Sequence, residues 1–206
     1  MPKVVPGYTS EARARIVEAA QRLFLTKGYR RTTMDDIAQE LGVSKGALYL
    51  YYRSKVDVLR EIQARNRRMS RAWMEQALTR TDPASGVSEQ FEDVFRRAIN
   101  RAQTALWFEI LGESAHDEEI RKAIRVDSRE DHRSLRKFLG ELRRRGLLAW
   151  QGDLDVLTFT VVALFQAAVW NLSVGADATA TQRVLRTALA SLLAPPSDRA
   201  APSPPR

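Results

Sequence analysis

The sequence contains no cysteine, which excludes disulfide bonds, thiolate nucleophiles and cysteine-ligated metal centres. Histidine is almost as scarce, with His116 beside Asp117 and His132 beside Asp131 as the two examples. Two scattered histidines without further matching ligands favour surface residues over a metal or acid–base site. The sequence also shows no nucleophile paired with a base and no phosphate-binding loop, so we expect no enzyme, no metal and no cofactor.

Strand-like alternation, internal repeats and a secretion signal are also missing. The first seven residues lack the apolar core of such a signal, so we expect a cytoplasmic protein. The last segment, residues 195–206, holds five prolines and is predicted to be disordered.

Basic residues are in excess, with 33 Lys and Arg against 25 Asp and Glu, a net charge of +8. Residues 1–55 hold ten basic and five acidic side chains, so this quarter of the chain carries +5 of that charge. Such an excess favours nucleic acid or an anionic surface as a partner. With 44% apolar and 28% charged residues, the composition is typical of a globular protein.

Apolar residues recur at helical spacing throughout, which predicts an all-α fold of about nine helices. Thr9 or Ser10 is expected to cap a first helix that ends at Lys27. Thr33 and Ser54, each followed three residues later by aspartate, predict two further helix starts. The longer helix after Ser54 is expected to end near Leu78, before a break at residues 80–88.

The second half is predicted to be helical as well. An apolar stripe runs from Phe91 to Leu111 and ends at Gly112. The remaining helices are expected from residues 114–117 to Gly146, over residues 154–174 after an Asp153 cap, and over about residues 179–193. We therefore predict a DNA-binding domain at 1–53, a ligand-binding and dimerisation domain at 54–194, and the tail at 195–206.

The segment 154–174 is almost entirely apolar, and residues 156–176 carry no charge over 21 positions. By length it could span a membrane. Thr158, Gln166 and Asn171 interrupt it, however, and no second span exists. A buried or dimer-forming helix is therefore the favoured interpretation.

Residues 33–55 have the pattern of a helix-turn-helix. Ile37, Ala38 and Leu41 share one face of a short helix, and Gly42 suits the turn because glycine accepts a left-handed backbone. A second helix is expected to open at Ser44, with Val43 and Leu48 inward. Its first turns would then enter a DNA groove.

This pattern resembles the TetR/AcrR family of bacterial transcriptional repressors. The resemblance rests on short motifs between residues 16 and 59: Ala19-Ala20 with Leu23-Phe24, Lys27-Gly28-Tyr29, Thr33, Ile37-Ala38, Gly42 to Gly46, Leu48-Tyr49, and Tyr51-Tyr52 before Lys55. It implies a homodimer formed through the last two helices, 154–174 and 179–193, and release from DNA when a small molecule enters the second domain. At Tyr51-Tyr52 the chain departs from the His-Phe or Tyr-Phe of many members, and the Tyr52 hydroxyl could reach a phosphate or point out of the core.

Eight residues of this segment carry groups suited to DNA contact: Thr33, Ser44, Lys45, Gly46, Ala47, Tyr49, Tyr51 and Lys55. The lysines could neutralise phosphates, the hydroxyls could donate to them, and the glycine permits close approach of the backbone. Base readout would fall to Lys45, Ala47 and Tyr49. The alternative is a capped surface helix. Thr33 has a competing role as a cap, and Tyr49 or Tyr52 could be partly core. The arginines at 65, 67, 68 and 71 are expected to form a solvated face rather than a DNA contact.

Five residues are candidates for lining a ligand pocket: Trp107, Phe108, Glu109, Phe165 and Trp170. Apolar walls with a few polar groups are typical of small-molecule sites, although aromatic residues at helical spacing are more often plain core. An inward-facing Glu109 or Glu113 would favour a cationic ligand. The function expected is a repressor that binds a palindromic operator as a homodimer and is released by an inducer. The alternative is a constitutive or architectural DNA-binding protein without a ligand.

Overall fold

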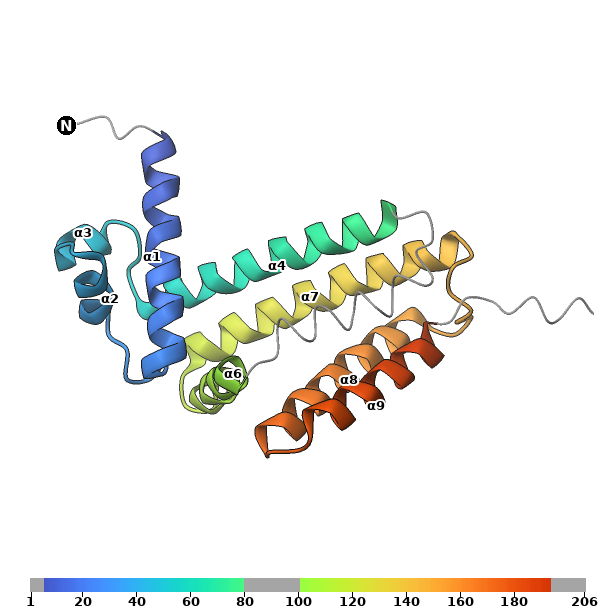
Figure 1. Ribbon diagram of the computed structural model, residues 1–206. Coiled ribbons are helices and arrows are strands. Elements are labelled where there is room, and N and C mark those ends of the chain that lie inside the picture. Colours follow the sequence, from blue (N-terminus) through green and yellow to red (C-terminus); the bar gives the residue numbers. More distant parts are fainter. Residues whose placement is uncertain (1–5, 80–100, 194–206) are drawn as a thin grey trace, which may run out of the picture. The chain divides into compact units, whose positions relative to one another are not determined.

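The computed structural model describes residues 6–79 and 101–193 (Figure 1). Within these ranges the chain forms eight helices and no strand, as the helical periodicity predicted. Their bounds are α1 Pro6–Lys27, α2 Met34–Leu41, α3 Lys45–Tyr49, α4 Lys55–Thr79, α6 Arg101–Ser114, α7 Glu118–Arg144, α8 Leu154–Ser173 and α9 Ala178–Leu192. The predicted break at 80–88, the first part of the stripe from Phe91 and the tail at 195–206 lie outside the described residues.

Most helix ends fall where the sequence predicted them. Thr33 caps α2, Asp153 caps α8, and the Ser54 hydroxyl accepts a hydrogen bond from the Asp57 N–H at 3.2 Å. The first helix is an exception, because α1 begins at Pro6 and not at Thr9 or Ser10. Proline is favoured in the first turn of a helix, where its missing N–H has no partner to lose.

Contacts divide the described residues into two compact units. One comprises residues 6–69 and 101–128, and the other comprises residues 70–79 and 129–193. The predicted boundary between residues 53 and 54 separates a DNA-binding from a ligand-binding domain by expected function, not by contacts, and it stays a prediction.

In the first unit α2 packs against α1 and α3, and α1 also contacts α6. Phe24, Ile37 and Leu48 lie at the centre of its core, each no more than 1% exposed. Burying side chains of this size stabilises the fold by about 1.5 to 3 kcal/mol each. The short helix α3 is therefore held in place by Leu48 rather than by its own length.

In the second unit α8 and α9 lie side by side (Figure 1). Leu139, Leu157 and Leu189 are buried at the centre of its core. Helix α8 is long and apolar enough to cross a membrane by length and composition alone. Only 22% of its most apolar 18-residue stretch is buried within the chain. Three large apolar side chains on α8 stay exposed, those of Val156, Phe159 and Trp170, and so does that of Val174, which directly follows the helix.

Candidate nucleic-acid interface

Helix α2 begins with a reciprocal cap. The Thr33 hydroxyl accepts a hydrogen bond from the Asp36 N–H at 3.1 Å, and the Asp36 carboxylate accepts one from the Thr33 N–H at 2.7 Å. Lys27 pairs with Asp36 at 2.7 Å, and this contact, helped by the Thr33 bonds, lowers the pKa of Asp36 to about 2. The cap orients α2, and it engages the hydroxyl for which the sequence analysis also predicted a DNA contact.

A tight turn joins α2 to α3. Gly42 adopts φ 67°, and the Val43 N–H donates to the Ala38 carbonyl at 3.0 Å. Ser44 then caps α3 by accepting a hydrogen bond from the Ala47 N–H at 3.2 Å. The prediction that Val43 faces inward is wrong, because its side chain is 43% exposed in this turn. Leu48 alone anchors the short helix in the core.

The opposite side of α3 presents Lys45, Gly46 and Tyr49 to solvent, with Ala47 half-buried. Nothing lies within 4 Å of a Cβ added at Gly46, so the surface there is open. Leu50, which directly follows α3, was not among the residues predicted to contact DNA, yet its side chain is 83% exposed. Two helical steps turn a side chain by about 200°, so the burial of Leu48 could have indicated that Leu50 faces outward.

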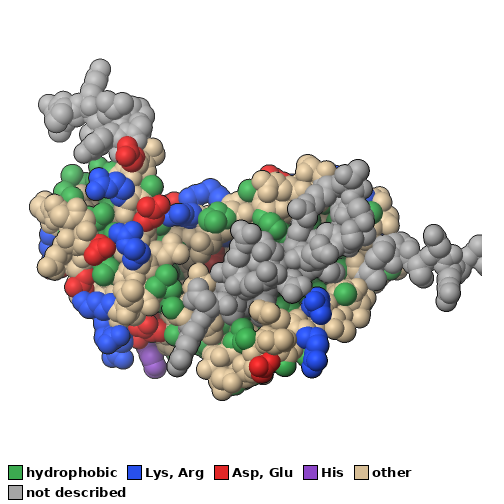
Figure 2. All heavy atoms as spheres, viewed as in Figure 1, with side chains coloured by type: hydrophobic (Ala, Val, Ile, Leu, Met, Phe, Trp, Pro, Cys, Tyr) green, Lys and Arg blue, Asp and Glu red, His purple; other side chains and the backbone are tan. Residues whose placement is uncertain are grey.

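Lys45 already has an ionic partner on α2. Its ammonium lies 2.8 and 3.0 Å from the two carboxylate oxygens of Asp35, and this hydrogen bond raises the pKa of Lys45. Both side chains are largely exposed, so solvent screens the pair. Basic and acidic side chains are also intermixed over this unit on the face seen in Figure 2. A DNA phosphate or base would therefore compete with Asp35 for Lys45.

Lys55, at the start of α4, uses its donors within the protein. Its ammonium donates to the carbonyl oxygens of Tyr29, Arg30 and Thr32 at 2.6, 3.3 and 2.9 Å. It also lies 4.3 Å from the centre of the Tyr29 ring, and burial lowers its pKa. The predicted phosphate contact stays a prediction, and it would require at least one carbonyl bond to be exchanged.

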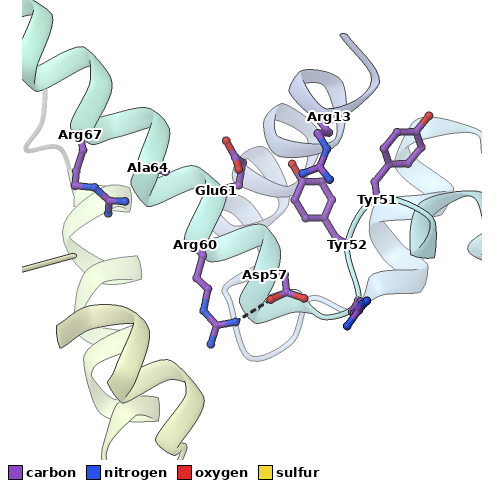
Figure 3. Close-up of a pocket in the computed structure, with 9 residues that line it drawn as sticks. Arg13, Tyr51, Tyr52, Asp57, Arg60, Glu61, Ala64 and Arg67 are labelled. Carbon is purple, nitrogen blue, oxygen red and sulfur yellow. Dashed lines mark hydrogen bonds and ion pairs between the residues drawn. The ribbon is translucent and has the colours of Figure 1, made fainter. Parts of the chain in front are cut away.

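The two neighbouring tyrosines differ in environment. Tyr51 is half-buried, whereas Tyr52 is only 4% exposed and belongs to the core. The Arg13 guanidinium lies 5.1 Å from the centre of the Tyr52 ring, and burial raises the pKa of Tyr52. Figure 3 shows the Tyr52 ring beside Arg13 and the Tyr51 ring away from it. Neither exposed orientation considered for the Tyr52 hydroxyl is found.

Known proteins share this arrangement. A sequence profile described as "Bacterial regulatory proteins, tetR family" matches residues 16–62, which include α2, the turn and α3. The HTH-type transcriptional regulator TtgR of Pseudomonas putida is 30% identical over 153 residues, which cover 70% of this chain and 71% of TtgR. The chain belongs to the TetR family.

Solved structures agree with a TetR-family fold over nearly the whole chain. Salmonella enterica GusR superposes with a TM-score of 0.72 at 21% identity, covering 93% of this chain and 99% of GusR. A protein from Saccharomonospora viridis, solved in complex with choline, gives a TM-score of 0.66 at 23% identity, covering 87% of this chain and 96% of that one. At these identities the likeness concerns the fold alone.

The five ligand candidates of this TetR-family chain fall in different units. Trp107, Phe108 and Glu109 lie on α6 in the first unit, and Phe165 and Trp170 on α8 in the second. Phe108 and Phe165 are half-buried, while Trp107 and Trp170 are 36% and 57% exposed. The Glu109 carboxylate is hydrogen-bonded to the backbone N–H groups of residues 29 and 30. The ligand assignment of all five stays a prediction.

An open pocket of about 560 Å³ lies beside the helix-turn-helix (Figure 3). Its lining comes from α1, the segment after α3, and α4: Arg13, Tyr51, Tyr52, Arg53, Asp57, Arg60, Glu61, Ala64 and Arg67. Arg60 pairs with Asp57 at 2.8 Å and with Glu119 at 2.7 Å, so part of the positive charge of the arginines that line the pocket is neutralised. The lining contains none of the five ligand candidates.

The arginines at 65 to 71 on α4 make specific contacts. Arg67 pairs with Asp127 of α7, and both side chains are only 17% exposed. Arg65 pairs with Glu18 at 3.4 Å and Arg68 with Glu61 at 3.0 Å. The expectation of a solvated face is therefore wrong for Arg67, because that helical position turns toward α7. Within the described residues no group of three His, Cys, Asp or Glu could hold a metal ion.

Proposed function

We propose that this TetR-family regulator is a cytoplasmic repressor that binds a palindromic operator as a homodimer and is released by a small-molecule inducer. The exposed face of α3 carries the proposal. It offers a lysine, a tyrosine hydroxyl and an apolar side chain from Lys45, Tyr49 and Leu50, on a helix capped by Ser44. Such groups suit guanine, phosphate and the thymine methyl group, respectively.

The exposed stripe on α8 supports the homodimer. Val156, Phe159 and Trp170 are each more than half exposed on a helix with no charge between Asp155 and Asp177, and Val184 of α9 is 64% exposed. Apolar surface of this extent is expected to be covered by a partner. A two-fold axis through α8 and α9 would relate two recognition helices, which read half-sites about 34 Å apart in successive major grooves.

Induction in this proposal is a shift between two states of the dimer. An inducer that fits only the state with misplaced recognition helices lowers operator affinity by its differential binding to that state. The choline found in the similar Saccharomonospora viridis protein supplies a first probe. In this chain Glu109 is bonded to the backbone N–H groups of residues 29 and 30 and Glu113 is paired with Arg30, so a cation bound at α6 would have to displace these contacts.

The test is operator selection followed by mutation. DNA fragments from the source genome are first selected for binding to the wild-type protein. Affinities for the selected fragment and for a scrambled version of it are then measured by fluorescence anisotropy at several salt concentrations. Lys45→Ala is expected to remove most of the preference, because Lys45 is the predicted base contact. Lys137→Ala, an equal charge loss on α7, should keep it. Unchanged operator binding by Lys45→Ala would show that α3 is wrongly assigned.

A second candidate is a constitutive DNA-binding protein without an inducer. Among the described residues, the pockets beside the helix-turn-helix and beside His132 contain none of the five predicted ligand residues. A thermal-shift screen with choline and larger hydrophobic cations separates the two. A compound that raises the unfolding midpoint and weakens operator binding supports induction, and no shift from any compound supports the constitutive protein.

A further inference from the structure

The turn between α1 and α2 is held from two sides. The Glu109 carboxylate of α6 accepts hydrogen bonds from the backbone N–H groups of Tyr29 and Arg30, at 3.0 and 2.7 Å. The Lys55 ammonium of α4 binds carbonyl oxygens of the same turn at 2.6 to 3.3 Å. The backbone donors therefore bind an anion on α6, and the acceptors bind a cation on α4.

The Glu109 carboxylate lies close to the turn at Gly28, where there is no room for a side chain. Gly28 adopts φ +91°, and a Cβ built at this position would lie 2.9 Å from Glu109 Oε2. A side chain at residue 28 would meet both a strained backbone and the carboxylate. Glycine thus leaves room for Glu109 against the backbone.

The turn is rigid within itself. The Thr32 side chain is 1% exposed, and its hydroxyl donates to the Gly28 carbonyl at 2.6 Å. Tyr29 is 2% exposed and packs edge-on against Phe24, with ring centres 5.0 Å apart. Thr33, the cap of α2, follows directly. A displacement of the turn would therefore move the cap of α2, and α2 packs against α3.

Glu113, one helical turn after Glu109, offers a matched comparison. Its carboxylate lies 3.8 Å from the exposed Arg30 guanidinium. Glu109 instead forms charge-assisted bonds to two backbone N–H groups, which are shorter and stronger than exposed side-chain pairs.

We propose that Glu109 is a positioning residue for DNA binding: its carboxylate clamps the 28–32 turn to α6 and holds α2 and α3 in the orientation that binds the operator. The proposal rests on the proposed function, in which α3 reads DNA. Motion of α6 would either break the two N–H bonds or move the recognition helix, so the clamp couples α6 to DNA binding. The ligand assignment of Glu109 is a separate matter.

The first test does not use DNA. Amide exchange at Tyr29 and Arg30 is measured by NMR in the full-length chain. Glu109→Ala should accelerate both amides at least about tenfold, because an exposed N–H exchanges whenever its bond is absent. Glu109→Gln, which keeps one acceptor oxygen but no charge, should fall between. Glu113→Ala should leave both amides unchanged. Equal exchange in wild type and Glu109→Ala would overturn the clamp.

The second test measures affinity for the selected operator. Glu109→Ala should weaken binding about tenfold without changing the slope against salt, since fewer molecules are competent while the phosphate contacts stay the same. Ile120→Ala, a destabilising change in the core of the same unit, should keep the wild-type affinity at temperatures where it is folded. Unchanged or tighter binding by Glu109→Ala, or an equal loss in Ile120→Ala, would contradict positioning. If the wild type prefers no fragment, the proposed function fails, and the exchange result alone decides whether the clamp exists.

Discussion

Apolar side chains are buried in the helix-turn-helix but exposed along helix α8. Around α2 and α3 the apolar residues Ile37 and Leu48 are fully buried against α1, and the helix starts are capped by Thr33 and Ser44. Along α8, Phe159 is 67% exposed in the single chain. The apolar side chains of the first region are covered by neighbouring helices of the same unit, whereas α8 has exposed apolar surface that suits a partner.

Two kinds of information are therefore present in one sequence. Polar caps at fixed spacing define a small fold from within, because each cap satisfies N–H groups of its own helix. A helix such as α8, which carries no charge after Asp155, specifies where contact occurs but not with which partner. The contrast can be tested by placing a charge on α8, by truncating buried and exposed leucines of α3, and by changing the cap of α2.

The largest effect is expected from Phe159→Asp. In a symmetric dimer the change places two carboxylates in the interface and removes two phenyl rings, so dimerisation should weaken by about 4 kcal/mol or more, roughly a thousandfold. Sedimentation velocity over a concentration series measures the change. Leu111→Asp, at a 42% exposed site on α6, is the matched control and should leave the dimer intact. A dimer of unchanged affinity would place the interface away from this face.

Leu48→Ala comes next. Its side chain is fully buried, and truncation of a buried leucine lowers the free energy of unfolding by about 3 kcal/mol through lost burial and a residual cavity. Chemical denaturation monitored by circular dichroism gives the value. A loss below about 1 kcal/mol would mean that α3 is not anchored by this residue.

Leu50→Ala should separate binding from stability. Its side chain is 83% exposed, so the free energy of unfolding should change by less than about 0.5 kcal/mol. Leucine has three more CH₂ equivalents than alanine, so their loss from contact with DNA should cost up to about 2.4 kcal/mol, a factor of roughly 60 in operator affinity. Anisotropy with operators altered at single thymines would locate the contact. Wild-type affinity on every operator would exclude Leu50 from the interface.

The smallest effect concerns Asp36 and pH. Its pKa is about 2 in the folded chain, below the ordinary value of 3.8, so its contribution to stability is present above about pH 4 and is lost as the pH falls toward 2. Asp36→Asn should flatten the fall in unfolding midpoint across this window. Equal slopes in the wild type and Asp36→Asn would rule out this linkage.

The sequence predicted what depends on neighbours along the chain. The caps at Thr33, Ser44 and Asp153 and the left-handed turn at Gly42 involve residues a few positions apart, so spacing alone indicates them. Burial of Tyr52 was one of the alternatives that the sequence left open, because its surroundings include Arg13 of α1, which local spacing does not specify.

Contacts between distant segments escaped prediction for the same reason. Arg67 belongs to a run of arginines that reads as a solvated face, and only the fold brings Asp127 of α7 to it. The two aromatic residues before Glu109 led to its prediction as a pocket residue. In the fold its carboxylate binds the turn at Tyr29, 80 residues earlier in the chain. Whether aromatic residues line a cavity or a core also depends on packing, which periodicity does not specify.

That separation of 80 residues has a consequence for synthesis of the chain. At about 5 to 20 residues per second, a ribosome takes roughly 4 to 16 s to extend from Tyr29 to Glu109. Helices α1 to α3 and Lys55 are complete well before then, and local helices form within microseconds. Each nascent chain therefore passes through an interval in which Lys55 has been synthesised and Glu109 has not, so only the cationic one of the two side chains that hold the turn is present.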